Sequence, residues 1–177
     1  SSLGYSDGYD NPKQNYQPEN VDGKSSAISR AATIAVEEKG MIIVISAGNE
    51  GNRAFRVVSL PADAQGVLTV GATSLAWPWV KQGYSSVGPP SLPYVKPDVV
   101  CYSFSGTSFS APVIAGLAAS IWQARPDLTN QEVARWIRES AHLASAPNNY
   151  MGYGIPDGRR ILQRILGHPV SPEPVNI

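Results

Sequence analysis

The first half of the chain alternates a helical apolar pattern with a short apolar run. Residues 25–39 place apolar side chains at helical spacing, which predicts a helix: Ile28, Ala31, Ala32, Ile34 and Ala35. Ser25 or Ser26 is expected to cap the start of this helix, and Gly40 to end it. Residues 41–45 are then apolar without interruption, a pattern typical of parallel strands buried on both faces.

The same alternation predicts two further strands and three further helices, over residues 67–70, 99–104, 108–124, 129–141 and 156–167. Thr129 and Glu132 have the spacing of a capping box at the start of one of these helices. Polar residues 6–24 and the Pro- and Gly-rich residues 77–97 are predicted to be loops. Strands separated by helices indicate an α/β fold with a mostly parallel sheet, and no linker divides the chain into two cores.

Composition and charge narrow the class of protein. The chain has 177 residues, of which 42% are hydrophobic and 16% charged, as expected of a globular domain. Its 14 basic and 14 acidic residues cancel, so neither nucleic acid nor an anionic membrane is an expected partner. No apolar run reaches the roughly 18 residues of a membrane span. Cys101 is the single cysteine, which excludes an internal disulfide and is expected to be a small buried hydrophobe.

Candidate chemistry is concentrated in residues 105–116, which read Ser-Gly-Thr-Ser-Phe-Ser-Ala-Pro-Val-Ile-Ala-Gly. The tight turn opens a helix of small and apolar residues, which places Ser108 at or near the helix N-terminus. Free backbone N–H groups and the helix dipole stabilise developing negative charge there. A serine hydroxyl in that position suits nucleophilic attack on a carbonyl if a base accepts its proton, although serine also commonly caps helices.

A second candidate is the loop Ser-Ala-Gly-Asn-Glu-Gly-Asn at residues 46–52, which follows the apolar run 41–45. Ligands of open α/β sheets bind at the carboxyl ends of strands, so the Asn49 amide is a candidate donor to an oxyanion. Asparagine beside glycine is also a common turn former. Each motif alone is weak, and the pair is far more specific.

Together the two motifs resemble those of the subtilisin-like serine proteases, the subtilases. Residues 106–112 look like the nucleophile motif of that family, and residues 46–51 look like the segment that carries its oxyanion asparagine. Other segments follow the family's pattern in order: 61–64, 67–72, 84–88, 96–100 and 152–154. The resemblance implies that residues 1–166 are the C-terminal portion of one subtilisin-like peptidase domain of three-layer α/β/α fold, with residues 167–177 as a loose tail.

The resemblance implies roles for particular residues. Ser108 is the implied nucleophile, and Asn49 and the Ser108 backbone N–H hold the oxyanion, with Thr107 shaping that hole. Glu50 is expected near the mouth of the pocket for the substrate side chain, where a carboxylate tolerates basic groups. The implied substrate-binding residues fall into two groups. Ser2, Leu3 and Gly4 form a strand that pairs with the peptide backbone. Ser46, Ala47 and Gly48 form one wall of that pocket.

The resemblance further implies a polypeptide substrate, a secreted or extracytoplasmic location, and chemistry that requires no cofactor. Many subtilases bind calcium at surface loops, and the oxygen-rich residues 7–22 could supply ligands, although such a stretch is more often a simple polar loop. No metal ligand is assigned on the sequence.

The chain also departs from the family pattern. The catalytic Asp and His motifs of subtilases precede the segment where this chain begins, and neither is found here. His142 and His168 are expected to be surface residues, and Asp63 and Asp98 match structural positions. The N-terminal part of the same domain is therefore the expected partner, and this chain alone is expected to be inactive and unstable. Only residues 99–105 separate the Lys-Pro-Asp segment from the Gly-Thr-Ser turn, which is shorter than in most subtilases.

Two other classes of function stay open on the sequence. The first is a pseudo-protease that binds peptides in a retained cleft without cleaving them. The second is an unrelated α/β domain whose Gly-Asn-Glu-Gly loop binds an anion or nucleotide. That reading lacks a phosphate-loop lysine motif and a Gly-x-Gly-x-x-Gly fingerprint, and an α/β-hydrolase is disfavoured because no Gly-x-Ser-x-Gly elbow surrounds Ser108.

Overall fold

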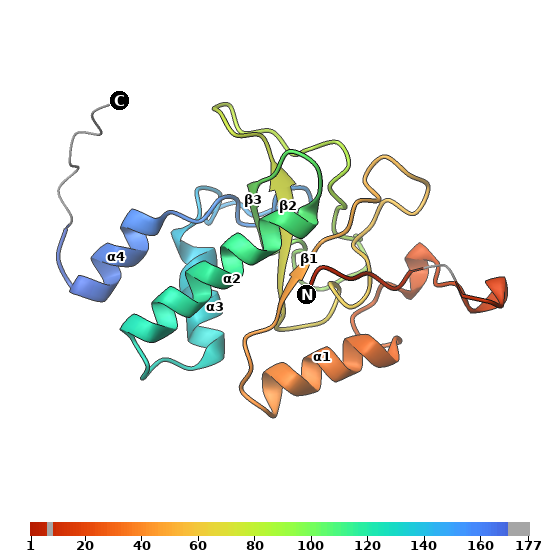
Figure 1. Ribbon diagram of the computed structural model, residues 1–177, viewed down its shortest axis with the longest axis horizontal. Coiled ribbons are helices and arrows are strands. Elements are labelled where there is room, and N and C mark those ends of the chain that lie inside the picture. Colours follow the sequence, from red (N-terminus) through yellow and green to blue (C-terminus); the bar gives the residue numbers. More distant parts are fainter. Residues whose placement is uncertain (7–8, 170–177) are drawn as a thin grey trace.

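The computed structural model describes residues 1–6 and 9–169, which form an α/β fold around a three-stranded parallel sheet (Figure 1). The strands are β1 (Val44–Ser46), β2 (Leu68–Thr73) and β3 (Val99–Tyr102), paired in chain order. Both pairs are parallel, so the carboxyl ends of the strands lie at one edge of the sheet.

The first residue of the chain continues the pairing beyond β1. The amino group of Ser1 donates to the Val44 carbonyl at 2.6 Å, and the Ser1 carbonyl accepts from the Ser46 N–H at 3.0 Å. This is the exchange of a parallel neighbour. It aligns residues 2–4 beside the carboxyl end of β1.

Helices cover the two faces of the sheet (Figure 1). The long helix α2 (Thr107–Ala124) contacts all three strands, α3 (Asn130–Ser140) packs on α2, and α4 (Gly158–Leu166) packs on α3. On the other face, α1 (Ala27–Glu37) contributes Val36 to a second apolar cluster. The two short 3₁₀ turns η1 (Pro12–Gln14) and η2 (Pro18–Asn20) lie within the loop between residue 9 and α1.

The alternation of strand side chains explains why the core has two parts. Val44 faces the cluster formed with α2, α3 and α4, whereas the next residue, Ile45, faces the cluster formed with α1 and the loop that precedes β2. Successive strand residues point to opposite faces, so a sheet covered on both faces needs apolar residues at consecutive positions. The three-layer arrangement expected from the sequence is confirmed.

Local signals predicted most helix ends correctly. Thr129 and Glu132 form the expected capping box, with the Thr129 hydroxyl accepting from the Glu132 N–H and the Glu132 carboxylate accepting from the Thr129 N–H. Gly167 ends α4 in the left-handed region, at φ 73°, where glycine has no Cβ penalty. Ser26 is the N-cap residue of α1, but its hydroxyl makes no cap hydrogen bond.

Strand bounds were predicted less well. β1 begins at Val44 rather than at residue 41, because residues 41–43 still bring the chain from α1 onto the sheet and Met41 is exposed. β3 ends at Tyr102, and the side chain of Phe104 is exposed. The short segment 99–105 therefore holds a four-residue strand and the start of a turn. In that turn the Ser103 hydroxyl donates to the Gly106 carbonyl at 2.6 Å.

A buried ionic network joins β3 to α3. Lys96 is 2% exposed, and its ammonium donates to the Asp98 carboxylate at 2.7 Å and to the Val67 carbonyl at 2.8 Å. The second Asp98 oxygen accepts from Arg138 at 3.1 Å. Burial lowers the pKa of Lys96, opposed by the neighbouring Asp98 carboxylate. The structural role expected for Asp98 is thus a link between the sheet and a helix.

Asp63 has a similar structural role on the opposite side of the sheet. Its fully buried carboxylate accepts from the Ser29 hydroxyl on α1 at 2.6 Å and from the Gly23 N–H at 2.8 Å. Burial raises the pKa of Asp63, and the two hydrogen bonds only partly offset this effect. Asp63 therefore ties α1 and the preceding loop to the body of the domain.

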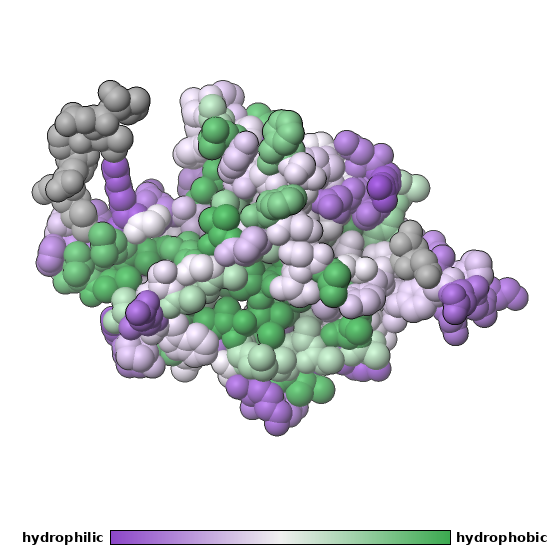
Figure 2. Space-filling model, viewed as in Figure 1, coloured by the Kyte–Doolittle hydropathy of each residue, from purple (hydrophilic) through white to green (hydrophobic). Residues whose placement is uncertain are grey.

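One face of α2 is apolar and exposed. The helix contains no charged residue over its 18 positions, and its outward side chains include Phe109, Pro112 and Val113. In the space-filling view the middle of this face is mostly white and green, and purple residues gather at its periphery (Figure 2). Uncharged helical faces of this kind are typical of positions that pack against protein.

Candidate active site

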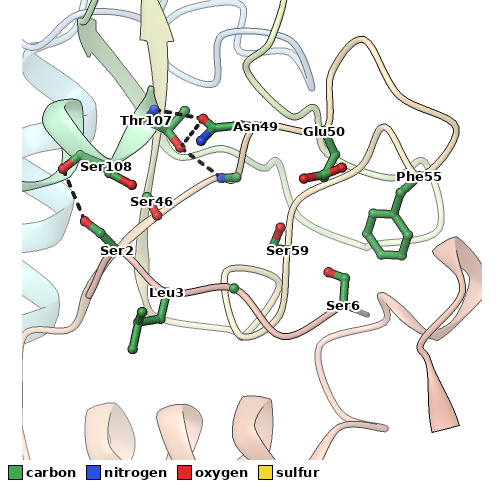
Figure 3. A pocket seen from close by; sticks show the side chains of 12 residues that line it. Ser2, Leu3, Ser6, Ser46, Asn49, Glu50, Phe55, Ser59, Thr107 and Ser108 are labelled. Carbon is green, nitrogen blue, oxygen red and sulfur yellow. Dashed lines mark hydrogen bonds between the residues drawn. The ribbon is translucent and has the colours of Figure 1, made fainter. Parts of the chain in front are cut away.

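A cleft lies beyond the carboxyl end of β1, against the N-terminus of α2 (Figure 3). It encloses about 170 Å³ and draws its walls from four segments of the chain: residues 2–6, residues 46–50, the segment that contains Phe55 and Ser59, and the first turn of α2. Its position is the one at which open α/β sheets bind ligands.

The orientation of the Asn49 amide is fixed by Thr107. The Thr107 backbone N–H donates to Asn49 Oδ1 at 3.0 Å, and the Thr107 hydroxyl donates to the same oxygen at 3.2 Å (Figure 3). Because a backbone N–H can only donate, the amide atom that faces it is the oxygen. Asn49 Nδ2 is therefore on the other side of the amide, and Asn49 is exposed, so this N–H₂ group can donate to a ligand.

Thr107 also ties the loop to the helix. Its hydroxyl accepts from the Gly48 N–H at 3.1 Å while donating to Asn49. Thr107 is fully buried, whereas Gly48 is half-buried and Asn49 exposed, so these hydrogen bonds are partly shielded from water. One hydroxyl thus connects the end of β1 to the start of α2 across 59 positions of sequence.

Ser108 is the second residue of α2 and is half-buried at the cleft. Its carbonyl accepts from the Ser2 hydroxyl at 3.2 Å, which joins the first residues of the chain to the helix. The N–H groups at a helix N-terminus have no intrahelical acceptor, and Ser108 and Asn49 both line the cleft.

Two glycines allow the cleft walls to approach one another. A Cβ at Gly48, whose φ is 101°, would lie 2.4 Å from Ser59 Oγ, and a Cβ at Gly4 would lie 2.7 Å from Ser59 Cβ. Any larger residue at either position would push Ser59 out of the cleft or deform the loop. The sequence predicted both glycines as site residues, and close packing is the reason they are needed.

The structure brings most of the predicted site residues together. The cleft lining includes Ser2, Leu3, Gly4, Ser46, Gly48, Asn49, Thr107 and Ser108. The Ala47 side chain does not line the cleft. It is fully buried in the apolar cluster on the face of the sheet that α1 covers, because alternation along the strand turns it away from the cleft. Only its backbone serves the site, since its carbonyl accepts from the Ser59 N–H at 2.9 Å.

Sequence reasoning did not find Ser6, Phe55 and Ser59, which also line the cleft. None lies in a motif with a recognisable spacing. Gly4 and Gly48 both lie against Ser59. This proximity exists only in the folded structure and cannot be read from a single sequence.

Neither histidine supplies a base to Ser108 in the part of the chain described. His142 follows α3 and packs its ring against Trp79, with ring centroids 4.9 Å apart, while its Nδ1 accepts from the Ile155 N–H at 2.9 Å. The sequence predicted a surface position for His142. The residue is instead half-buried, because residues 141–147 turn back onto the body of the domain. His168 is exposed beyond α4.

A structural calcium ion is allowed by the family resemblance and stays untested. Over residues 1–6 and 9–169, no group of three or more His, Cys, Asp or Glu side chains is placed to hold a metal. Asp7 lies outside the described residues. Elsewhere in this stretch the side-chain oxygens accept from nearby backbone N–H groups, so the described residues do not form a ready ligand set: Asn11, Asn15, Asn20 and Asp22.

Known proteins similar in sequence to this chain include proteases by name. Mycosin-1 of Mycolicibacterium smegmatis is 30% identical over 169 residues, covering 75% of this chain and 38% of that protein. Subtilisin-like protease 1 of Arthroderma gypseum is 34% identical over 142 residues, covering 76% of this chain and 28% of that protein. This chain therefore spans well under half the length of these curated relatives.

Solved structures show the same fold. The crystal structure of MycP1 from Mycobacterium smegmatis aligns with a TM-score of 0.62 at 26% identity, over 78% of this chain and 46% of that one. The self-cleaved protease domain of PatA aligns with a TM-score of 0.63 at 20% identity, over 84% of this chain and 58% of that one. The fold class is thus a partial subtilisin-like α/β domain. The subtilase family model of peptidases S8 matches residues 1–154, and the chain belongs to that family of serine proteases.

Proposed function

We propose that this chain is the nucleophile-bearing part of a serine endopeptidase that cleaves peptide bonds through an acyl-enzyme on Ser108. The observation that carries the proposal is the pair of hydrogen bonds from Thr107 to Asn49 Oδ1. They leave Asn49 Nδ2 as a donor beside Ser108 at the start of α2. Preorganised donors aimed at a developing oxyanion are the main source of rate enhancement in acyl transfer.

In the proposed reaction, Ser108 Oγ attacks the carbonyl carbon of the scissile bond while its proton passes to a histidine. Asn49 Nδ2 and the Ser108 N–H donate to the oxyanion of the tetrahedral intermediate, and Thr107 holds the Asn49 amide in place. The same proton then goes to the leaving amine as the C–N bond breaks. Water deprotonated by the histidine hydrolyses the resulting ester, which returns the proton to Ser108.

The histidine and the aspartate that orients it are proposed to come from a part of the protease domain outside these residues. The exposed, uncharged face of α2 supports this, because it begins at Phe109, directly after the nucleophile. A segment of the same domain that packed there would cover the apolar face and bring its side chains to Ser108. The backbone of residues 2–4, exposed beside the cleft, is proposed to pair with an extended substrate.

A secreted or extracytoplasmic location is proposed by family membership. One structural neighbour, MycP1, is described as an essential component of the type VII (ESX-1) secretion system. Within residues 1–6 and 9–169, the helices are too short or too polar to cross a bilayer.

Fluorophosphonate labelling, followed by mass spectrometry to locate the adduct, tests the function. We expect labelling at Ser108 in the longest natural precursor and none in the 177-residue chain alone. The variant Ser108→Ala should abolish labelling. Ser120→Ala is the matched control, because Ser120 is exposed on the same helix and donates only to the Gly116 carbonyl. A folded precursor that is not labelled would overturn the proposal.

The alternative is a pseudo-protease that binds peptides without cleaving them. A pseudo-protease would have the same cleft as a protease. The two differ in the rest of the protein, because a pseudo-protease has no histidine that reaches Ser108. A folded full-length protein that binds extended peptides and resists labelling would establish it.

A further inference from the structure

A second cavity lies next to residues 55–59, the segment that carries two of the side chains lining the cleft. It is formed by the segments 56–57, 87–90 and 149–150, and among the described residues it shares no lining side chain with the cleft. The cavity encloses about 340 Å³, which falls within the range of small-ligand sites, about 300–1,000 Å³. The proposed peptidase reaction does not use it.

Backbone hydrogen bonds hold the three segments together. The Val87 N–H donates to the Arg56 carbonyl at 3.2 Å, and the next N–H along the chain, that of Gly88, donates to the Asn149 carbonyl at 2.9 Å. The Val87 carbonyl in turn accepts from the Val58 N–H at 2.9 Å. Because these bonds are made by the main chain, the walls of the cavity are in place before a ligand arrives.

The walls of this cavity are largely apolar. Val57 and Val87 are buried and pair with each other as a parallel bridge. Pro90 and Tyr150 also line the cavity and are exposed to solvent. The Tyr150 N–H donates to Asn148 Oδ1 at 2.9 Å, which fixes the turn that carries the ring. An apolar ligand group that covered these side chains would remove their apolar surface from water, which is favourable.

Among the described residues, the charged side chain that lines the cavity is that of Arg56. Its backbone is left-handed, at φ 58°, a conformation that is uncommon for a residue other than glycine and that sets the direction in which the side chain leaves the chain. The half-buried Asn149 lines the cavity together with Arg56. A guanidinium and an amide thus border the same apolar space.

The potential around Arg56 is positive. Burial lowers the pKa of Lys81, and the nearby charge of Arg56 lowers it further. The Lys81 ammonium donates to the carbonyls of Gln82 and Ser85, each at 2.8 Å, so its position is fixed. The described residues form no ion pair with either cation. This charge complements an anion.

We propose that this cavity binds a carboxylate carried by an apolar group, and that Arg56 recognises the carboxylate. The planar fork of a guanidinium matches a carboxylate with two parallel hydrogen bonds, and the Asn149 amide offers a further donor. The apolar group lies on Val57 and Val87 and against the Tyr150 ring. The C-terminus of a peptide that ends in an apolar residue has this chemistry, and so does a short fatty acid. The inference does not depend on the proposed function.

Other ligand classes fit the cavity less well. An amine would meet Arg56 and Lys81 as like charges. Inorganic phosphate matches the guanidinium but leaves the apolar walls in water. A neutral apolar molecule covers the walls without using the guanidinium. An anionic head and an apolar body are therefore both required for the tightest binding.

Isothermal titration calorimetry of the full-length natural protein carrying Ser108→Ala, which prevents cleavage, tests the proposal. The probes are a short peptide that ends in leucine with a free carboxylate, the same peptide as a C-terminal amide, the same peptide ending in serine, and octanoate. We expect the free carboxylate to bind about tenfold more tightly than the amide, because one charge-assisted pair is lost. Leucine should bind more tightly than serine. The affinity of octanoate relative to the leucine peptide shows which source of carboxylate the cavity prefers.

Variants of the lining residues locate the binding. Arg56→Asn should raise Kd for the leucine carboxylate about tenfold and hardly change Kd for the amide, and asparagine tolerates the left-handed backbone. Tyr150→Ala alters an exposed side chain and should raise Kd more for the leucine than for the serine peptide. Arg53→Asn is the matched control, because Arg53 is an exposed cation of the same loop that does not line the cavity. It should leave every Kd unchanged.

The cleft also offers donors to a carboxylate, so Asn49→Ala is measured in the same background. Weaker binding in Arg56→Asn but not in Asn49→Ala supports the second site. Weaker binding in Asn49→Ala alone assigns the carboxylate to the cleft and overturns the inference. Equal Kd for carboxylate and amide, or no detectable binding of either carboxylate, also overturns it. If Arg56→Asn lowers Tm, Arg56→Lys decides: it keeps the charge without the fork and should raise Kd by a smaller factor, and an unchanged Kd refutes the role of Arg56.

Discussion

The Thr107 hydroxyl is the most informative atom to remove. Thr107→Val keeps the shape and the β-branch of the side chain, so packing and helix propensity change little. It deletes the acceptor of the Gly48 N–H and one of the two donors to Asn49 Oδ1. The Asn49 amide then depends on the Thr107 backbone N–H alone.

The structure sets the size of the effect. Leaving a buried donor without a partner costs about 1–3 kcal/mol, and the Gly48 N–H is half-buried. The lost bond to the exposed Asn49 adds little, so we expect the free energy of unfolding to fall by about 2 kcal/mol. For a domain of this size that corresponds to a fall in Tm of about 4–8 °C. We also expect kcat to fall about tenfold, or about 1.4 kcal/mol in the barrier, because a loosened amide donates less well to the oxyanion.

The assay is differential scanning calorimetry of the full-length protein carrying Ser108→Ala, which prevents self-cleavage, with and without Thr107→Val. Steady-state kinetics of the Ser108 forms supply kcat. Thr107→Ser is the matched control, since it restores the hydroxyl without the methyl group and should recover most of kcat. A Thr107→Val protein with unchanged Tm and unchanged kcat would refute the reasoning that this hydroxyl organises the site.

Three further outcomes are expected. Asn49→Ala should lower kcat of the full-length protein by about 10²–10³ with little change in KM, the magnitude found when an oxyanion donor is removed from a subtilisin. An effect on KM alone would assign Asn49 to ground-state binding. Lys96→Met should lower the free energy of unfolding in urea by about 3 kcal/mol, because it leaves the buried Asp98 carboxylate short of a partner, and an unchanged midpoint would contradict this. Because burial raises the pKa of Asp63, its contribution to stability is full below the ordinary value of about 3.9 and is lost as pH rises through the raised value. Urea unfolding from pH 3 upward should therefore show this loss in the native protein and not in Asp63→Asn.

The pattern of apolar residues was sufficient to predict the layers of the fold and much of the site. Ser108 and Asn49 were identified because local chemistry fixes their positions: a tight turn before a helix, and a loop after a buried strand. Capping signals such as Thr129 with Glu132 act within one turn of helix, so they are visible in the sequence.

Features that depend on tertiary contacts could not be predicted. Ser6 and Ser59 meet in the cleft only because β1 and the first residues of the chain lie side by side. Ala47 was assigned to the pocket wall from its place in the motif, but strand alternation turns it into the core. His142 stands in a polar stretch of sequence, and its burial follows from the ring of Trp79, more than 60 positions away in the chain.

The hydrogen bonds from Thr107 to Asn49 span 58 positions of sequence, and β2 lies between the strands that carry the two ends. Such contacts form late, because loop closure must be complete before they can be made. Under the proposed function, a chain that has not closed this loop has the nucleophilic serine without its oxyanion hole, and we expect it to be inactive towards neighbouring chains. Proteolytic activity, as proposed, would then depend on completed folding and would serve as a measure of it.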